Sequence, residues 1–160
     1  MIKAFLLVLT LAASLASAAV AGPYEDGPAA YIKGDYATAL KLYRPLADQG
    51  YAEAQFMLGL MYHGGQGVPQ DYAQAVSWFR KAADQGYAYA QYGLGVMYYY
   101  GQGVPQDYIQ EHMWLNLAAS HQTDPTERAN AVKQRDLVAA KMNTAQIAEA
   151  QRLASAWKPK

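Results

Sequence analysis

The chain has 160 residues, no cysteine, and equal numbers of basic and acidic residues, so its formal net charge is zero. Without cysteine it can form no disulfide, and its stability must come from packing. A nucleic-acid-binding protein usually carries a clustered basic face, which this composition does not indicate, so nucleic acid is excluded as a partner.

The first 21 residues have the features of a secretory signal peptide. Lys3 is followed by an uncharged apolar run, AFLLVLTLAASLASAAVA, and small residues stand at cleavage spacing at positions 16–18 and again at 19–21. An uncleaved membrane anchor is the alternative, but the run is short and contains several Ala, Ser and Thr residues. The sequence therefore predicts an exported protein, periplasmic or secreted, of 139 residues. No stable membrane insertion is expected after cleavage.

Residues 22–50 predict an irregular helix pair. A short helix over about residues 26–33 meets the next helix through Gly34. The segment GDYATALKLYRPLADQG, residues 34–50, aligns in register with the units that follow it. Pro45 lies inside the second helix, where it removes one backbone hydrogen bond and kinks the helix. We expect the helix to continue past Pro45, because the apolar stripe continues.

Residues 51–86 and 87–122 are two copies of one unit. Twenty of the 36 aligned positions are identical, and repetition at a period of this size indicates a solenoid. Each copy predicts two helices joined by the octapeptide GQGVPQDY, at residues 65–72 and again at 101–108. Gly59 lies inside the first of these helices, where we expect a neighbouring helix to come too close for a Cβ atom.

The octapeptide predicts a structural joint rather than a phosphate-binding loop. Gly65 and Gly67 permit positive φ angles, and Asp71 can accept hydrogen bonds from the free N–H groups that begin the next helix. The apolar Val68 is expected to fill the gap between paired helices. A P-loop needs a Gly-Lys pair, which the chain lacks, and the dinucleotide fingerprint needs a third glycine where Gln70 stands.

The two copies share a set of small, apolar and capping positions. In the first copy these are Ala54, Leu58, Gly59, Tyr62, Gly65, Gly67, Val68, Asp71, Ala75, Trp78, Ala82, Ala83 and Gly86. The second copy keeps Ala90, Leu94, Gly95, Tyr98, Gly101, Gly103, Val104, Asp107, Trp114, Ala118 and Ala119. This pattern resembles the Sel1-like repeat, a relative of the tetratricopeptide repeat. The resemblance implies an all-α fold, a right-handed α-α superhelix in which these positions are structural.

The second copy departs from the Sel1-like pattern at two positions. Glu111 stands where the family has Ala, and Gln122 stands where it has Gly. These departures predict that the array ends there.

Residues 123–160 predict a terminal helix pair that caps the solenoid. Asp124 followed by Pro125 is typical of the start of one helix, and Asn143 with Gln146 forms a capping-box-like pair at the start of the other. Residues 22–122 carry 5 basic and 9 acidic residues, whereas residues 123–160 carry 7 basic and 4 acidic residues. The basic tail is interpreted first as a solvated outer face and second as a docking surface.

The sequence contains no catalytic or metal-binding pattern. No serine after residue 21 stands in a G-x-S-x-G motif, and His63, His112 and His121 form no H-x-x-x-H pair. Asp71 and Asp107 are already assigned as helix caps. The sequence therefore predicts a protein that is not an enzyme, with no metal and no cofactor.

The interaction hypothesis depends on the 14 tyrosines, because tyrosine combines a large contact area with few rotors and a polar tip. The tyrosines that recur in phase predict core packing: Tyr62, Tyr72, Tyr98 and Tyr108. In the Sel1-like family the first helix of each unit is expected to line the concave side. The partner-binding candidates in that groove and at its rim are therefore Met57, Tyr89, Tyr92, Tyr99 and Tyr100.

The sequence favours an interaction scaffold of the cell envelope that holds another protein or peptide in this groove. The acidic body and the basic tail would set the orientation of the partner. The alternative function is a binder of small molecules, peptidoglycan or other glycans, with or without hydrolysis, because tyrosine faces stack on sugar rings. The alternative role for the variable tyrosines is packing against the adjacent repeat or the terminal helices.

Overall fold

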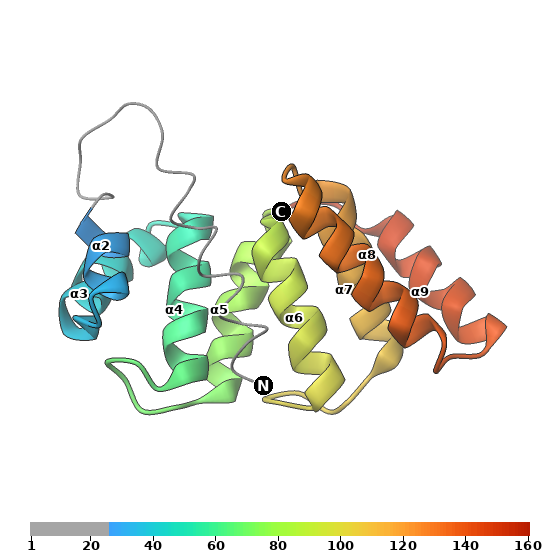
Figure 1. Ribbon diagram of the computed structural model, residues 1–160, viewed down its shortest axis with the longest axis horizontal. Helices are drawn as coiled ribbons and strands as arrows, with labels where there is room; N and C mark the ends of the chain where they lie inside the picture. Colours follow the sequence, from blue (N-terminus) through green and yellow to red (C-terminus); the bar gives the residue numbers. More distant parts are fainter. Residues whose placement is uncertain (1–25) are drawn as a thin grey trace.

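The computed structural model describes residues 26–160, and the predicted signal peptide lies outside these residues. The regular structure in the described part is helical throughout: α2 (Asp26–Ile32), α3 (Tyr36–Asp48), α4 (Ala52–Gly64), α5 (Tyr72–Asp84), α6 (Ala88–Tyr100), α7 (Tyr108–His121), α8 (Pro125–Ala139) and α9 (Thr144–Ala156). The helices follow one another in a row, with α2 and α3 at one end and α8 and α9 at the other (Figure 1). The predicted all-α solenoid is confirmed.

Successive helices pack together from α2 to α8, and α7 packs against both α8 and α9. The last two helices therefore share one neighbour instead of extending the row by another unit. None of the helices within residues 26–160 combines the length and apolar character that a membrane span needs.

The first helix pair has the predicted turn at Gly34, and its second helix contains Pro45 as predicted. Gly34 has a φ of 79° between α2 and α3, a left-handed conformation that suits glycine. Pro45 lies inside α3, which continues to Asp48. The expectation that this helix runs past its proline is confirmed.

The octapeptide is a joint, as predicted, and it docks on the preceding unit. Gly67, at a φ of 72°, lies so close to the start of α3 that a Cβ atom there would stand 2.9 Å from the carbonyl oxygen of Tyr36. In the second copy, a Cβ atom on Gly103 would overlap the backbone of Tyr72, the first residue of α5. Val68 packs against the core. Glycine is therefore required here by close approach as well as by its φ angle.

Local hydrogen bonds explain where the helices begin and end. Asp71 Oδ1 accepts from the backbone N–H of Gln74 at 3.0 Å, which caps α5 as predicted. At the other end of α5, Gly86 has a φ of 88° and its N–H donates to the carbonyl of Ala83. Gly86 therefore ends the helix in the left-handed conformation that its position predicts.

The helix-interior glycines lie where neighbouring helices approach closely. A Cβ atom on Gly59 would overlap the Phe79 ring of α5, and one on Gly95 would stand 2.9 Å from Leu115 of α7. This confirms the predicted reason for glycine inside α4 and α6.

The two repeat tryptophans differ, since Trp114 is fully buried and Trp78 is half-buried.

Candidate interaction surface

The first helix of each repeat is buried on most of its circumference. All eight residues from Ala54 to Met61 of α4 are buried, because α4 packs between α3 and α5. Met57 is only 5% exposed and Tyr89 only 8% exposed. The Tyr89 ring contacts the Phe56 ring at a centroid distance of 6.1 Å. In this structure Met57 and Tyr89 therefore pack in the core, where a partner does not reach them, instead of lining an open groove.

The terminal helix α8 covers part of α6. Tyr92 is half-buried and packs against Ala118 and Ala119 of α7 and Ala131 of α8. The crevice between these three helices has a volume of about 10 Å³, which is room for about one water molecule. Packing against the terminal helices, the alternative considered for the variable tyrosines, is therefore what Tyr92 does.

The remaining two candidates form an aromatic cluster at the joint between α6 and α7. The rings of Tyr99 and Tyr100 meet edge-on at a centroid distance of 4.7 Å. The ring centroids of Tyr99 and Tyr108 are 6.4 Å apart. Tyr100 is 51% exposed, whereas Tyr99 and Tyr108 are half-buried. We call these three residues the tyrosine cluster.

The tyrosines that recur in phase are less buried than predicted. The structure leaves all four half-buried: Tyr62, Tyr72, Tyr98 and Tyr108. The hydroxyl oxygens of two of them accept a hydrogen bond from an arginine, that of Tyr98 from Arg80 at 2.7 Å and that of Tyr62 from Arg44 at 2.9 Å. The predicted core packing is therefore confirmed in part for Tyr62, Tyr72 and Tyr98, which are half-buried and pack against the core. Tyr108 belongs instead to the candidate surface.

Lys141, in the connection between α8 and α9, lies over the tyrosine cluster. Its Nζ atom donates to the Tyr99 hydroxyl at 2.9 Å and stands 4.4 Å from the Tyr99 ring centroid and 5.5 Å from that of Tyr108. The bond with Tyr99, with the nearby Tyr108 and Glu111, raises the pKa of Lys141. Sequence reasoning missed this residue because the tail does not share the register of the repeat.

Glu111 of α7 lies buried near Lys141. Its side chain is 4% exposed, and its Oε2 atom has no hydrogen-bond partner among the described residues. Burial raises the pKa of Glu111 to about 7, against the opposing attraction of Lys141. The signal was present in the sequence, since Glu111 replaces the alanine of the repeat, but it was interpreted only as the end of the array.

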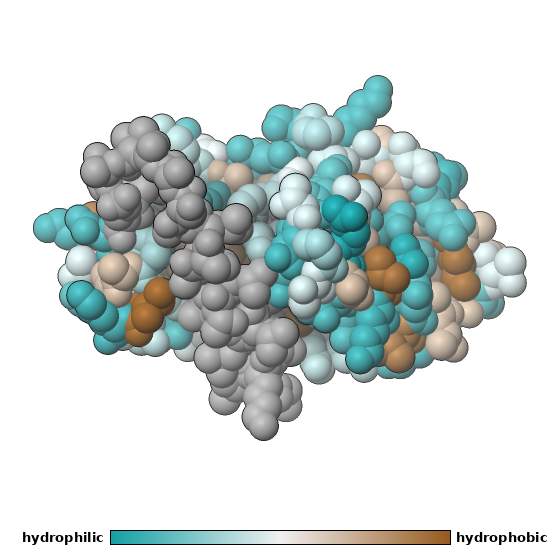
Figure 2. Space-filling model, turned by 45° about the horizontal axis from the view of Figure 1, so that its top comes forward, coloured by the Kyte–Doolittle hydropathy of each residue, from teal (hydrophilic) through white to brown (hydrophobic). Residues whose placement is uncertain are grey.

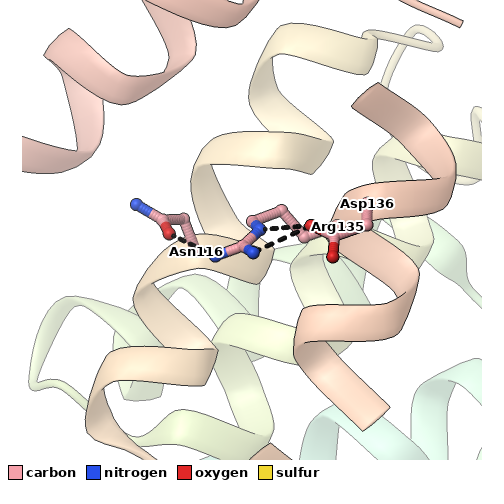
Figure 3. A network of polar contacts seen from close by, with 3 residues as sticks. All are labelled: Asn116, Arg135 and Asp136. Atoms are coloured by element: carbon pink, nitrogen blue, oxygen red, sulfur yellow. Dashed lines mark hydrogen bonds and ion pairs between the residues drawn. The ribbon is translucent and has the colours of Figure 1, made fainter. Parts of the chain in front are cut away.

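A polar network holds α8 against α7 (Figure 3). Arg135 of α8 donates to Asn116 Oδ1 of α7 at 3.2 Å and pairs with its neighbour Asp136 at 2.8 Å. The bond to Asn116 joins α8 to α7, and the ion pair with Asp136 orients the Arg135 guanidinium group.

A shallow hollow of about 650 Å³ runs along α8. The described residues that line it are Pro125, Arg128, Ala129, Val132, Lys133, Asp136 and Leu137. On the face drawn in Figure 2, hydrophobic residues stand as separate spots among hydrophilic ones. The part of that face that the described residues form and that lies uncovered therefore shows no large apolar patch.

No group of three or more His, Cys, Asp or Glu side chains within residues 26–160 is placed to hold a metal ion. The candidate surface is therefore aromatic and charged, without a metal-ligand set in the described part.

Comparison with known families and structures identifies the repeat. A family model described as the Sel1 repeat matches residues 14–51, 52–87 and 88–122. No curated protein matches the chain.

Two solved structures are similar to the chain. One is a protective antigen of uropathogenic Escherichia coli that displays an SLR fold, with a TM-score of 0.77 and 31% identity, covering 84% of this chain. This chain spans only 29% of the antigen's length. The other is a Sel1 repeat protein from Oxalobacter formigenes, with a TM-score of 0.53 and 37% identity, covering 54% of this chain and 66% of that one.

Proposed function

Because the chain belongs to the Sel1 repeat family, whose members generally mediate protein–protein interactions, we propose that it is a non-enzymatic scaffold of the cell envelope. It binds another protein or peptide through the tyrosine cluster. Its export is inferred from the signal-peptide pattern of residues 1–21.

The observation that supports this function best is the exposure of Tyr100 beside Tyr99 and Tyr108. Large aromatic side chains are usually kept inside a small helical protein, and tyrosine is enriched at interface hot spots. The exposed Tyr100 ring meets the half-buried Tyr99 ring edge-on, and Tyr99 in turn lies near the Tyr108 ring, so less conformational entropy is lost when a partner binds Tyr100. A single supported aromatic residue of this kind is a suitable anchor for a peptide or a loop.

Photo-crosslinking in the native host tests the proposal. The full-length chain, with its first 21 residues, carries a photoreactive amino acid at Tyr100 in one strain and at Tyr51 in another. Tyr51 is a matched control because it is 47% exposed and lies in the connection between α3 and α4. We expect a discrete protein adduct from position 100 that position 51 does not give. Equal adducts from both positions, or none from position 100, would contradict the proposal, and muropeptide binding would then be the next measurement.

A further inference from the structure

At the first two joints of the array, a pair of aromatic rings is hydrogen-bonded by a glutamine side chain from the following joint. Tyr31 and Tyr36 form a ring pair at 5.4 Å. The side chain of Gln66, from the first octapeptide, accepts from the Tyr31 hydroxyl and donates to the Tyr36 hydroxyl at 3.0 Å. The octapeptide glutamine therefore joins one unit to the aromatic pair of the unit before it.

The same arrangement recurs one unit later. His63 and Tyr72 form a ring pair at 5.3 Å, and Oε1 of Gln102, from the second octapeptide, lies 3.3 Å from His63 Nε2. Tyr99 and Tyr108 are the equivalent pair in the next unit, 36 positions further on. No third octapeptide follows them in the sequence, so no glutamine of this kind reaches that pair.

Lys141 takes the place of the missing glutamine, and it brings a positive charge. Its ammonium group contacts the faces of both rings and bonds to the Tyr99 hydroxyl. An ammonium held over aromatic faces is a cation–π arrangement. Lys141 is exposed and lies on a turn rather than in a helix, so its side chain can leave the rings without unfolding a helix.

Glu111 makes the third pair different from the two before it. The equivalent residue in the first copy is Ala75, which has no charge. The Glu111 carboxyl is nine-tenths or more buried and lacks a partner for Oε2, while Lys141 gives its hydrogen bond to Tyr99 instead. A buried carboxyl oxygen without a partner is unfavourable, and its presence in a folded protein needs an explanation, which a binding role would supply.

We propose that the Tyr99–Tyr108 ring pair and Glu111 form a recognition site for a lysine or arginine side chain of the partner protein. Lys141 is the exchangeable internal occupant of this site. The inference rests on the proposed function, because it names what the interaction surface recognises. The excess of acidic residues in positions 22–122 complements such a partner.

The test is a titration of engineered variants of the full chain with a lysine analogue. Lys141→Met removes the internal occupant, and Lys141→Gln is a second variant that can still bond to Tyr99. The probe is Nα-acetyl-lysine methylamide, with the norleucine analogue as its uncharged control. Lys81→Met is the matched protein control, because Lys81 also lies over a ring, that of Trp78 at 3.8 Å, but in a different part of the chain. Binding is followed by NMR of labelled tyrosine rings.

We expect the probe to shift the Tyr99 and Tyr108 signals of Lys141→Met saturably, with a dissociation constant of about 1 mM. The affinity of the wild type for the probe should be at least about tenfold lower than that of Lys141→Met. The reason is that the tethered Lys141 side chain competes with the probe for the same rings at a high effective concentration. Adding Glu111→Gln to Lys141→Met should weaken binding about fivefold or more. The norleucine analogue and Lys81→Met should show no saturable shift.

The proposal is overturned if Lys141→Met binds the probe no better than Lys81→Met, or if Glu111→Gln leaves the affinity unchanged. Crosslinking separates this failure from failure of the proposed function. A partner captured at position 100, but insensitive to changes at Lys141 and Glu111, would leave the scaffold function standing and refute the cation site. Probe binding without any captured partner would establish the site and refute the scaffold function.

Discussion

Replacing Glu111 with glutamine should stabilise the protein above neutral pH and have little effect in acid. Glutamine keeps the size of the side chain but cannot ionise. Burial raises the pKa of the folded-state carboxyl from 4.5 to about 7, so folding favours its protonated form. Stability from this group is therefore fully present below pH 4.5 and is lost as pH rises to the folded-state value. The shift corresponds to a loss of ~3 kcal/mol, since one pKa unit is ~1.4 kcal/mol.

Urea unfolding of the wild type and of Glu111→Gln, followed by tryptophan fluorescence, measures this effect at steps from about pH 4 to about pH 8. The two free energies of unfolding should converge near pH 4 and differ by up to ~3 kcal/mol near pH 8. Glu149→Gln is the matched control, because Glu149 bonds to Arg152 and has a lowered rather than a raised pKa. A constant difference between wild type and Glu111→Gln across the whole range would refute the reasoning, since it would mean that the carboxyl titrates alike in both states.

Four further substitutions test the helix packing, a helix cap and a buried histidine. Gly59→Ala should destabilise the fold by ~1–3 kcal/mol through overlap with the Phe79 ring, whereas Gly93→Ala, whose Cβ would lie 3.6 Å from the same ring, should be neutral or stabilise by up to ~1 kcal/mol; equal thermal shifts in the two variants would contradict this account. Asp107→Ala should cost ~1 kcal/mol, because Asp107 caps α7 through two backbone N–H groups, and an unchanged urea midpoint would count against that. Burial lowers the pKa of His112, so its contribution to stability is present above its ordinary pKa of 6.5 and is lost as pH falls below that value. His112→Val should therefore flatten the acid side of the stability profile, and an unchanged profile would disprove the assignment.

Features that depend on neighbours in sequence could be predicted, because each is decided within a few residues. Asp71 as a cap and Gly86 as a helix end follow from local hydrogen bonds, and their positions are as expected. Gly59 could also be interpreted correctly, since close approach of another helix is a physical reason for a glycine inside a regular helix.

The groove residues could not be located in the same way. A sequence pattern reveals which face of a helix is buried only when another face is exposed. All eight residues from Ala54 to Met61 are buried, so the pattern of α4 contains no open face to find. For the same reason the difference between copies at Tyr89 identified a variable position but not an accessible one, because α6 packs between α5 and α7 and the Tyr89 side chain is buried.

The terminal helices complete the array by replacing the contacts that another repeat would make. Arg80 of the first copy bonds to Tyr98, but the equivalent residue in the next copy is Asn116, and an arginine from α8 bonds to it instead. Likewise Lys141 contacts the ring pair that an octapeptide glutamine would otherwise reach. A cap needs only to satisfy these groups, and a neutral side chain at position 141 would do so if position 111 kept the alanine that the first copy has at position 75. The combination of Lys141 with Glu111, whose Oε2 atom has no partner among the described residues, therefore exceeds what capping requires, which is why we propose recognition at this end of the array.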